Sequence, residues 1–178
     1  MILAKVCVLG ELSVGKTSLV RRFVDRSFSD AYLSTVGVKI SRKLLRVSPA
    51  SGANHVDLQL VIWDLEGGQS FRQMSASYLK GALGAVVVGD VTRESTLEAI
   101  GEHIHHFRQL NPDSPVSVAL NKNDLHGGPS PLAQIERYRE EGIAVARYTS
   151  AKTGGGVDEL FEEFATHLLN RLHSASSN

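Results

Sequence analysis

Residues 10–17 read Gly-Glu-Leu-Ser-Val-Gly-Lys-Thr and directly follow an apolar run, a combination that strongly restricts the fold of this chain. A Gly-x4-Gly-Lys-Thr spacing between a strand and a helix is typical of a loop that wraps phosphate groups. Glycines let the backbone approach the phosphates, while N–H groups, the helix N-terminus and a lysine face their negative charge. The loop predicts nucleotide contacts from six residues: Ser13, Val14, Gly15, Lys16, Thr17 and Ser18.

Apolar runs and helical periodicities alternate along the whole chain. This alternation predicts an α/β fold in three layers, with helices on both faces of a mostly parallel, six-stranded sheet that has one antiparallel edge strand. We find no repeat, linker or boundary, so residues 1–178 are predicted to form one domain. The predicted strands are 4–10, 38–47, 56–64, 85–90, 116–120 and 143–148, and the predicted helices are 16–23, 73–80, 96–110, 132–141 and 157–172.

Composition excludes several classes of protein. Lysine plus arginine and aspartate plus glutamate both number 19, so no broad basic surface for nucleic acid or anionic lipid is expected. The single cysteine, Cys7, lies in an apolar run and is predicted to be a buried, unreactive thiol. No secretory signal, membrane span, N-terminal acylation site or prenylation cysteine is found, which predicts a cytoplasmic protein without a lipid anchor. Loss of a longer tail stays open as an alternative.

Asp64 ends an apolar run and is followed three residues later by Gly67. A carboxylate at the mouth of a parallel sheet can reach a magnesium ion, to which Thr17 would add its hydroxyl. Gly67 would offer an unobstructed N–H to the γ-phosphate. The alternative is a strand-terminating turn in which Asp64 is only a local cap.

Base recognition is predicted from two further segments. Asp124 can accept hydrogen bonds from N1–H and the exocyclic amine of guanine, a donor pair that adenine lacks. Asn121 would tie the loops together, and Lys122 would lie along the base and ribose. The segment Ser150, Ala151 and Lys152 would add a backbone N–H to the guanine O6, although such a tripeptide is also an ordinary surface loop.

With these motifs in this order, the chain resembles the Ras superfamily of small GTPases, and most closely its Rab branch, over nearly its whole length. Residues 28–38 are similar to a Rab switch I, and residues 77–82 and 86–92 to the Rab segment after switch II. The resemblance implies a P-loop NTPase G domain that binds GTP or GDP with Mg²⁺. It also implies that Thr35 coordinates magnesium in the GTP state, that Phe28 packs on guanine, and that Tyr32 lies over the phosphates. Thr35 and Gly67 would sense the γ-phosphate.

The chain departs from the family pattern where the water-positioning glutamine is expected. Gly68 occupies that place, with Gln69 one residue further along. A glycine has no side chain to orient a water, so slow hydrolysis is predicted, unless the flexible Gly67-Gly68 pair lets Gln69 swing into place. The catalytic set would then comprise Lys16, Thr35, Gly67, Gly68 and Gln69.

Two more departures lie beside the phosphates. Leu12 occupies a position where small residues predominate, and would crowd the γ-phosphate and obstruct an arginine finger from a partner. Glu66 adds a carboxylate near magnesium; we favour a side chain that points to solvent over one that weakens GTP binding.

Partner surfaces follow from the resemblance. An effector would dock on switch I, switch II and the segment between them, through Val36, Gly37, Val38, Trp63, Phe71 and Tyr78, although packing alone also explains the aromatic residues. An exchange factor and a GTPase-activating protein are further expected partners of a monomer.

Other charged and histidine residues are given simpler interpretations. The basic residues Lys39, Arg42, Lys43 and Arg46 are interpreted as protection of an edge strand rather than as an acidic-partner site. His103, His105 and His106 are interpreted as a solvated helix face rather than a metal cluster.

Two functions are carried forward. The first is a GTP-operated binding switch with slow hydrolysis, favoured by the magnesium set Thr17, Thr35 and Asp64. The second is a GTP-binding interaction module without useful turnover, favoured by Gly68 and Leu12. An adenine-nucleotide kinase is opposed by Asp124 and by the lack of an arginine-rich lid.

Overall fold

A computed structural model describes residues 1–29, 35–49, 54–65, 76–128 and 130–176. Six strands form one sheet in the order β2-β3-β1-β4-β5-β6, and only the β2–β3 pair is antiparallel. This arrangement confirms the predicted sheet and its antiparallel edge strand. The strands are β1 (Ile2–Leu9), β2 (Val38–Val47), β3 (Val56–Leu65), β4 (Gly84–Asp90), β5 (Val116–Asn121) and β6 (Val145–Tyr148).

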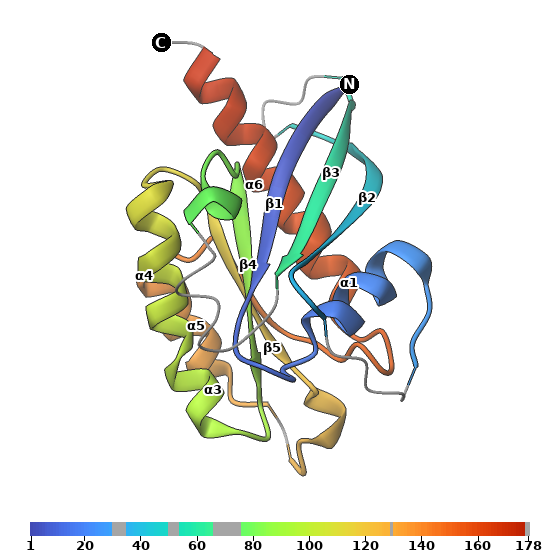
Figure 1. The fold of residues 1–178 in the computed structure, drawn as a ribbon, viewed down its shortest axis with the longest axis vertical. Coiled ribbons are helices and arrows are strands. Elements are labelled where there is room, and N and C mark those ends of the chain that lie inside the picture. Colours follow the sequence, from blue (N-terminus) through green and yellow to red (C-terminus); the bar gives the residue numbers. More distant parts are fainter. Residues whose placement is uncertain (30–34, 50–53, 66–75, 129, 177–178) are drawn as a thin grey trace.

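Helices cover both faces of the sheet, as Figure 1 shows. Two of them, α1 and α6, lie on one face, and α3, α4 and α5 cover the opposite face. The described part of the predicted 73–80 helix is helical over 76–79, while residues 73–75 lie outside the described residues. The helices are α1 (Lys16–Asp25), α3 (Glu94–Glu98), α4 (Ile100–Leu110), the short 3-10 helix η1 (Asn123–Leu125), α5 (Leu132–Glu140) and α6 (Val157–Ser176).

Two apolar cores hold the layers together. On one face, side chains of β1 and β3 pack against α1 and α6, and the Phe23 and Phe161 rings stack with centroids 4.2 Å apart. On the other face, Ile104 and Phe107 of α4 and Tyr138 of α5 pack against the alternate residues of the central strands. Cys7 lies in this second core, which confirms the prediction of a buried cysteine, and burial raises the pKa of its thiol to about 12.

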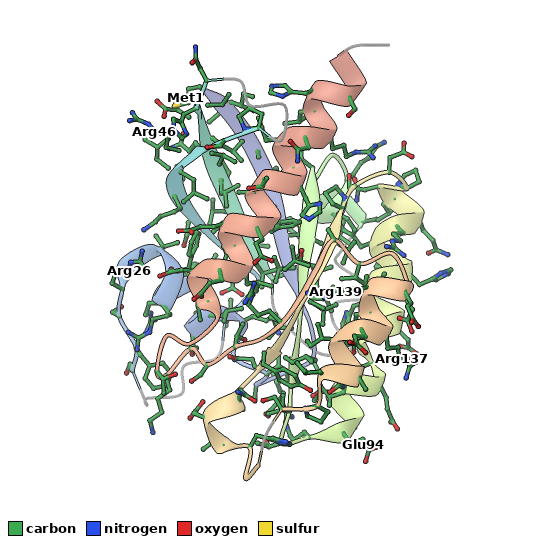
Figure 2. The ribbon with its side chains drawn as sticks, turned by 180° about the vertical axis from the view of Figure 1, so that it is seen from behind. Met1, Arg26, Arg46, Glu94, Arg137 and Arg139 are labelled. Atoms are coloured by element: carbon green, nitrogen blue, oxygen red, sulfur yellow. The ribbon has the colours of Figure 1, made fainter. Side chains whose placement is uncertain are left out.

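The carboxyl ends of the parallel strands meet at one edge of the sheet, where the connecting loops gather. Figure 1 shows this edge at the bottom and both chain termini at the top. In Figure 2, seen from behind, α6 crosses the sheet diagonally from the top toward α1. Ligands of open α/β sheets bind at the carboxyl edge, so the fold predicts a binding site at this edge.

Several element boundaries differ from the predictions. The predicted helix 96–110 is two helices, α3 and α4, interrupted at Ala99, and it begins two residues earlier, at Glu94. Strand β6 begins at Val145 rather than at residue 143, because Ile143 N–H instead donates to the Tyr138 carbonyl after α5. Helix α6 extends to Ser176, beyond the predicted end at 172.

Candidate nucleotide-binding site

The loop between β1 and α1 requires its two outer glycines. Gly10 has φ +139°, and a Cβ there would lie 2.2 Å from the Val88 carbonyl oxygen. Gly15 has φ +99°, and a Cβ there would lie 2.4 Å from Nδ2 of Asn121. Both angles are in the region that only glycine adopts without strain, and both positions leave no room for a side chain. The loop backbone is therefore packed directly against β4 and β5.

Charge and backbone strain are concentrated in the same loop. The Lys16 side chain folds back over it, and its Nζ donates to the carbonyls of Gly10 and Glu11, each at 2.8 Å. Ser13 has φ +63°, an uncommon backbone conformation for a residue with a side chain, of the kind found at ligand-binding loops. The Val14 side chain is fully buried in the core, so only its backbone remains on the loop.

Three side-chain oxygens converge beside the start of α1. The Thr17 hydroxyl donates to Oδ2 of Asp64 at 2.5 Å, and Thr17 Oγ1 lies 2.6 Å from Thr35 Oγ1. The other oxygen of Asp64, Oδ1, is buried and has no hydrogen-bond partner among the residues that the structure describes. Burial raises the pKa of the Asp64 carboxyl, against the Thr17 hydrogen bond and the charges of Lys16 and Lys39.

This oxygen set fits a hard divalent cation. Carboxylate and hydroxyl oxygens are ligands that Mg²⁺ prefers, and an orphaned, buried carboxylate oxygen gains the partner it lacks when a cation binds. The oxygens of Thr17, Thr35 and Asp64 therefore fit part of the coordination shell of a magnesium ion.

Asn121 joins three segments at the end of β5. Its Nδ2 donates to the Val14 carbonyl at 3.0 Å, which anchors the phosphate loop. Its Oδ1 accepts from the Ala151 N–H and from the Thr149 hydroxyl, both at 3.2 Å. The amide is almost fully buried, so these contacts fix its orientation.

Asp124 and Lys122 are each oriented by a partner. The Ser150 hydroxyl donates to Oδ1 of Asp124 at 2.6 Å, and the Asp124 side chain remains exposed to the cavity. Lys122 has φ +65°, and its ammonium lies 2.6 Å from Oδ2 of Asp90, at the end of β4. The sequence did not predict that Lys122 pairs with this carboxylate.

These segments enclose a cavity of ≈ 280 Å³ at the carboxyl edge of the sheet. Most of the predicted site residues that the structure describes line it. Val14, Asp64 and Ser150 do not, and Asp64 is connected to the lining through its bond to Thr17. The lining residues are Leu12, Ser13, Gly15, Lys16, Thr17, Ser18, Arg21, Phe28, Ser29, Thr35, Leu65, Asn121, Lys122, Asp124, Leu125, Ala151 and Lys152.

Several predicted residues lie outside the described residues. They are Tyr32, Glu66, Gly67, Gly68, Gln69 and Phe71. Of the candidate effector residues that are described, Val36 is 87% exposed, Gly37 has φ +73°, and Val38 begins β2. Trp63 and Tyr78 are half-buried and in contact, with ring centroids 6.1 Å apart, and the Lys5 ammonium lies over the indole ring.

The interpretation of His103 as part of a solvated face is wrong. His103 is only 7% exposed, and its Nε2 lies 3.1 Å from Oε1 of Glu11 in the phosphate loop. It faces the sheet because it shares the buried side of α4 with Ile100, Ile104 and Phe107. His105 does lie on the exposed side. Among the described ranges, no group of three or more His, Cys, Asp or Glu side chains could hold a metal ion.

Sequence reasoning missed two arginines that support the site. Arg22 of α1 donates to the carbonyls of Ala151 and Lys152 at 2.7 and 2.6 Å. Arg93 bonds both Asp90 and the Leu12 carbonyl. The sequence did contain a signal for the contact between Arg93 and Asp90, because Asp90 ends an apolar run as Asp64 does. No local pattern indicates the contacts of Arg22.

Parallel strands that end around a phosphate-binding loop define the class of P-loop nucleotide-binding proteins. Within that class the chain belongs to the Ras family, whose profile matches residues 5–170. It is 33% identical to human Ras-related protein Rab-4A over 174 residues, which cover 97% of this chain and 77% of that protein.

Two further relatives support a Rab-like position in the family. GTP-binding protein ypt4 of Schizosaccharomyces pombe is 30% identical over 96% of this chain and 73% of its own length. Ras-related protein RABF2b of Arabidopsis thaliana is 32% identical over 93% of this chain and 80% of its own length. The chain is thus a Rab-like small GTPase of the GTP-binding switch type. None of the described helices combines the length and apolar character needed to cross a bilayer.

Proposed function

We propose that this protein is a guanine-nucleotide switch that binds GTP and GDP with Mg²⁺ and hydrolyses GTP slowly. The observation that carries the proposal is the convergence, around one cavity, of the phosphate loop, Thr17 and Thr35 of the three-oxygen cluster, and the Asn121–Asp124 segment. Asp64 joins them through its bond to Thr17. In this proposal residues 1–178 act as one domain and as a monomer in the cytoplasm.

Phosphate binding is assigned to the loop and the helix that follows it. Backbone N–H groups from Ser13 to Ser18 would face the phosphates. The Lys16 ammonium, which bonds two loop carbonyls, would also donate to phosphate oxygens. Thr17, Thr35 and Asp64 would hold Mg²⁺, which when bound neutralises charge on the phosphates. The Thr17–Thr35 contact supports coupling of switch I to this cluster.

Guanine selection is assigned to Asp124. Because Ser150 occupies one face of Oδ1, the carboxylate is held in one orientation and can accept both guanine donors. Lys122 and Phe28 would flank the base. The Ala151 N–H, which donates to Oδ1 of Asn121 at 3.2 Å, would share this hydrogen with the guanine O6. Arg22 holds the segment in place after this N–H, since it donates to the Ala151 and Lys152 carbonyls.

Hydrolysis is proposed to be slow because Gly68 stands where the family has its water-positioning glutamine. Lys16, Thr35 and the Gly67 N–H would still stabilise the γ-phosphate. Leu12, 48% exposed at the cavity, would further hinder an arginine finger. The alternative function, an interaction module that binds GTP without turnover, rests on the same two residues.

The partner surface is proposed to lie on β2, β3 and the switches. Val36, Trp63 and Tyr78 would contact an effector together with Gly37, Val38 and Phe71, and an exchange factor and a GTPase-activating protein would complete the cycle. The exposed apolar side chains of Val36, Ile40 and Leu44 support this proposal, because Ile40 and Leu44 belong to β2 and Ile40 pairs with Trp63 of β3.

Single-turnover hydrolysis of preloaded GTP with Mg²⁺ tests the proposal, with the wild type beside Gly68→Gln. The wild type is expected to hydrolyse GTP at or below the roughly 10⁻⁴ s⁻¹ of an unassisted Ras-type enzyme, and the variant faster. A variant no faster than the wild type would show that Gly68 is not the missing catalytic position. No turnover in the wild type, with recovery in the variant, would favour the interaction module.

A further inference from the structure

A buried carboxylate at the end of β4 organises two loops of the nucleotide site. Asp90 has a side chain only 1% exposed, and its Oδ1 accepts from the Thr92 N–H at 3.0 Å and from the Thr92 hydroxyl at 2.6 Å. Its Oδ2 lies 2.6 Å from the Lys122 ammonium and 3.0 Å from Nε of Arg93. Burial raises the pKa of Asp90, but these hydrogen bonds outweigh it and hold the pKa below its usual value.

Arg93 extends this network to the phosphate loop. While its Nε is bonded to Asp90, its Nη2 donates to the Leu12 carbonyl at 2.8 Å. The guanidinium therefore bridges two acceptors that lie on segments far apart in the sequence. Lys122, on the other side of Asp90, lines the cavity. The Asp90 carboxylate thus contacts the segment Asn121–Asp124, called the base loop from here on, and holds the phosphate loop through Arg93.

The Arg93 bond to Leu12 fixes the orientation of a particular peptide group. A trans peptide is planar, so its C=O and the N–H of the next residue point in opposite directions. Because the Leu12 carbonyl points to Arg93, the Ser13 N–H points away from Arg93. Ser13 lines the cavity and has the strained φ of +63°, a conformation that persists only where its surroundings impose it.

We propose that Arg93 is a positioning residue for phosphate recognition, which holds the Leu12–Ser13 peptide so that the Ser13 N–H faces the outer phosphates. It acts without touching the nucleotide, and Asp90 keeps its guanidinium in place. The inference rests on the proposed nucleotide-binding function of the same cavity.

Arg93→Lys separates this role from simple charge pairing. A lysine keeps a positive charge beside Asp90, but a single ammonium does not reproduce the fork that bonds two acceptors. Arg137→Lys is the matched control, because Arg137 forms an exposed i,i+4 pair with Glu141 on α5, where Figure 2 labels it at the molecular edge. Dissociation constants for GDP and GMP with Mg²⁺ are measured for each protein by competition with a fluorescent GDP.

The affinity of Arg93→Lys for GDP is expected to fall roughly tenfold, the loss expected of one charge-assisted hydrogen bond, while its affinity for GMP stays within about twofold. The control should match the wild type for both ligands. Equal losses for GDP and GMP would overturn the proposal, because a general effect on the fold or the base does not distinguish them. Unchanged GDP affinity would also overturn it. A wild type that binds neither ligand would instead overturn the proposed function itself.

Discussion

At the scale of single residues, the site depends on groups that are held in place by close packing and hydrogen bonds. Gly15 lies against the Asn121 amide, and Asn121 in turn anchors the Val14 carbonyl. The base loop and the phosphate loop are therefore in direct contact, through close packing and a hydrogen bond. Small changes at this contact should affect nucleotide binding more than they affect the cores.

Gly15→Ala tests this contact. The added Cβ would lie 2.4 Å from Nδ2 of Asn121 at a φ of +99°, so we expect more than about tenfold weaker GDP binding and a loss of about 1–3 kcal/mol in the free energy of unfolding. GDP titration and denaturant unfolding measure the two effects. Gly101→Ala is the control, because the methyl group it adds would have no neighbouring atom within 4 Å beyond its own helix backbone, and α4 should gain about 0.5–1 kcal/mol. Unaltered GDP binding by Gly15→Ala would contradict the proposed contact.

Asp124→Asn tests guanine recognition. An amide cannot accept both guanine donors but can donate to the C2 carbonyl of xanthine, so GDP affinity should fall by about 100-fold and xanthosine diphosphate affinity should rise. Isothermal titration calorimetry measures the affinities for GDP and for xanthosine diphosphate. Asp113→Asn, a change of an exposed carboxylate 3.6 Å from Arg171 and before the start of β5, should leave both affinities unaltered. If the preference for GDP persists in Asp124→Asn, another residue reads the base.

At the scale of elements, α4 contacts the phosphate loop through one titratable pair. Burial lowers the pKa of His103 below its ordinary value of 6.5, the nearby Lys16 charge acts in the same direction, and the hydrogen bond to Glu11 and the charge of Glu102 act in the opposite direction. The folded state therefore binds a proton at His103 less readily than the unfolded chain does. The contribution of His103 to stability is present above pH 6.5 and is lost as the pH falls through the folded-state pKa.

His103→Gln should remove this part of the pH dependence. The wild type is expected to lose up to about 1.4 kcal/mol of unfolding free energy per pH unit below 6.5, from this group, and the variant should show a shallower decline. Denaturant unfolding from pH 7.5 to about 5 provides the measurement. His105→Gln is a matched control on the exposed side of the same helix. Parallel profiles for wild type and His103→Gln would exclude His103 as the source.

The sequence predicted the elements well where each pattern is local. Strand β2 was predicted with its observed bounds, because its apolar and polar residues alternate along the strand and this local pattern is typical of an edge strand. The break at Ala99 was missed because that residue keeps helical angles, so the apolar periodicity continues through it. The burial of His103 was readable from its helical spacing with Ile104 and Phe107, but its partner, Glu11, lies 92 positions away and was not. For the same reason, the Asp90–Arg93–Leu12 network could not be read from any single segment.

At the scale of the whole molecule, nucleotide binding should be coupled to folding. The ligand would bind segments that follow β1, β3 and β5, which assemble only when the sheet does. Anything that binds the native state alone stabilises it by mass action. A bound nucleotide would therefore link these segments at the carboxyl edge of the sheet, between the two apolar cores.

GDP with Mg²⁺ is expected to raise the thermal midpoint of unfolding. At a hundredfold excess over the dissociation constant the gain is about 2.7 kcal/mol, or about 5–10 °C for a chain of this size. Chelation of Mg²⁺ should reverse part of the shift, because Thr17, Thr35 and Asp64 would lose their shared cation. Differential scanning fluorimetry measures both steps, and Lys16→Ala, which lacks the phosphate-binding ammonium, should show little shift. A wild-type midpoint insensitive to GDP would contradict the assigned site.

The Lys5–Trp63–Tyr78 contact gives the molecule an intrinsic optical reporter. Trp63 is the only tryptophan in the chain, and its ring lies 4.3 Å from the Lys5 ammonium and beside Tyr78, one residue before Asp64. Indole emission depends on nearby charge and on solvent access. A shift of β3 or of the helical turn at 76–79 would therefore change the fluorescence of Trp63, and we expect nucleotide exchange to be visible in this signal on the unlabelled protein.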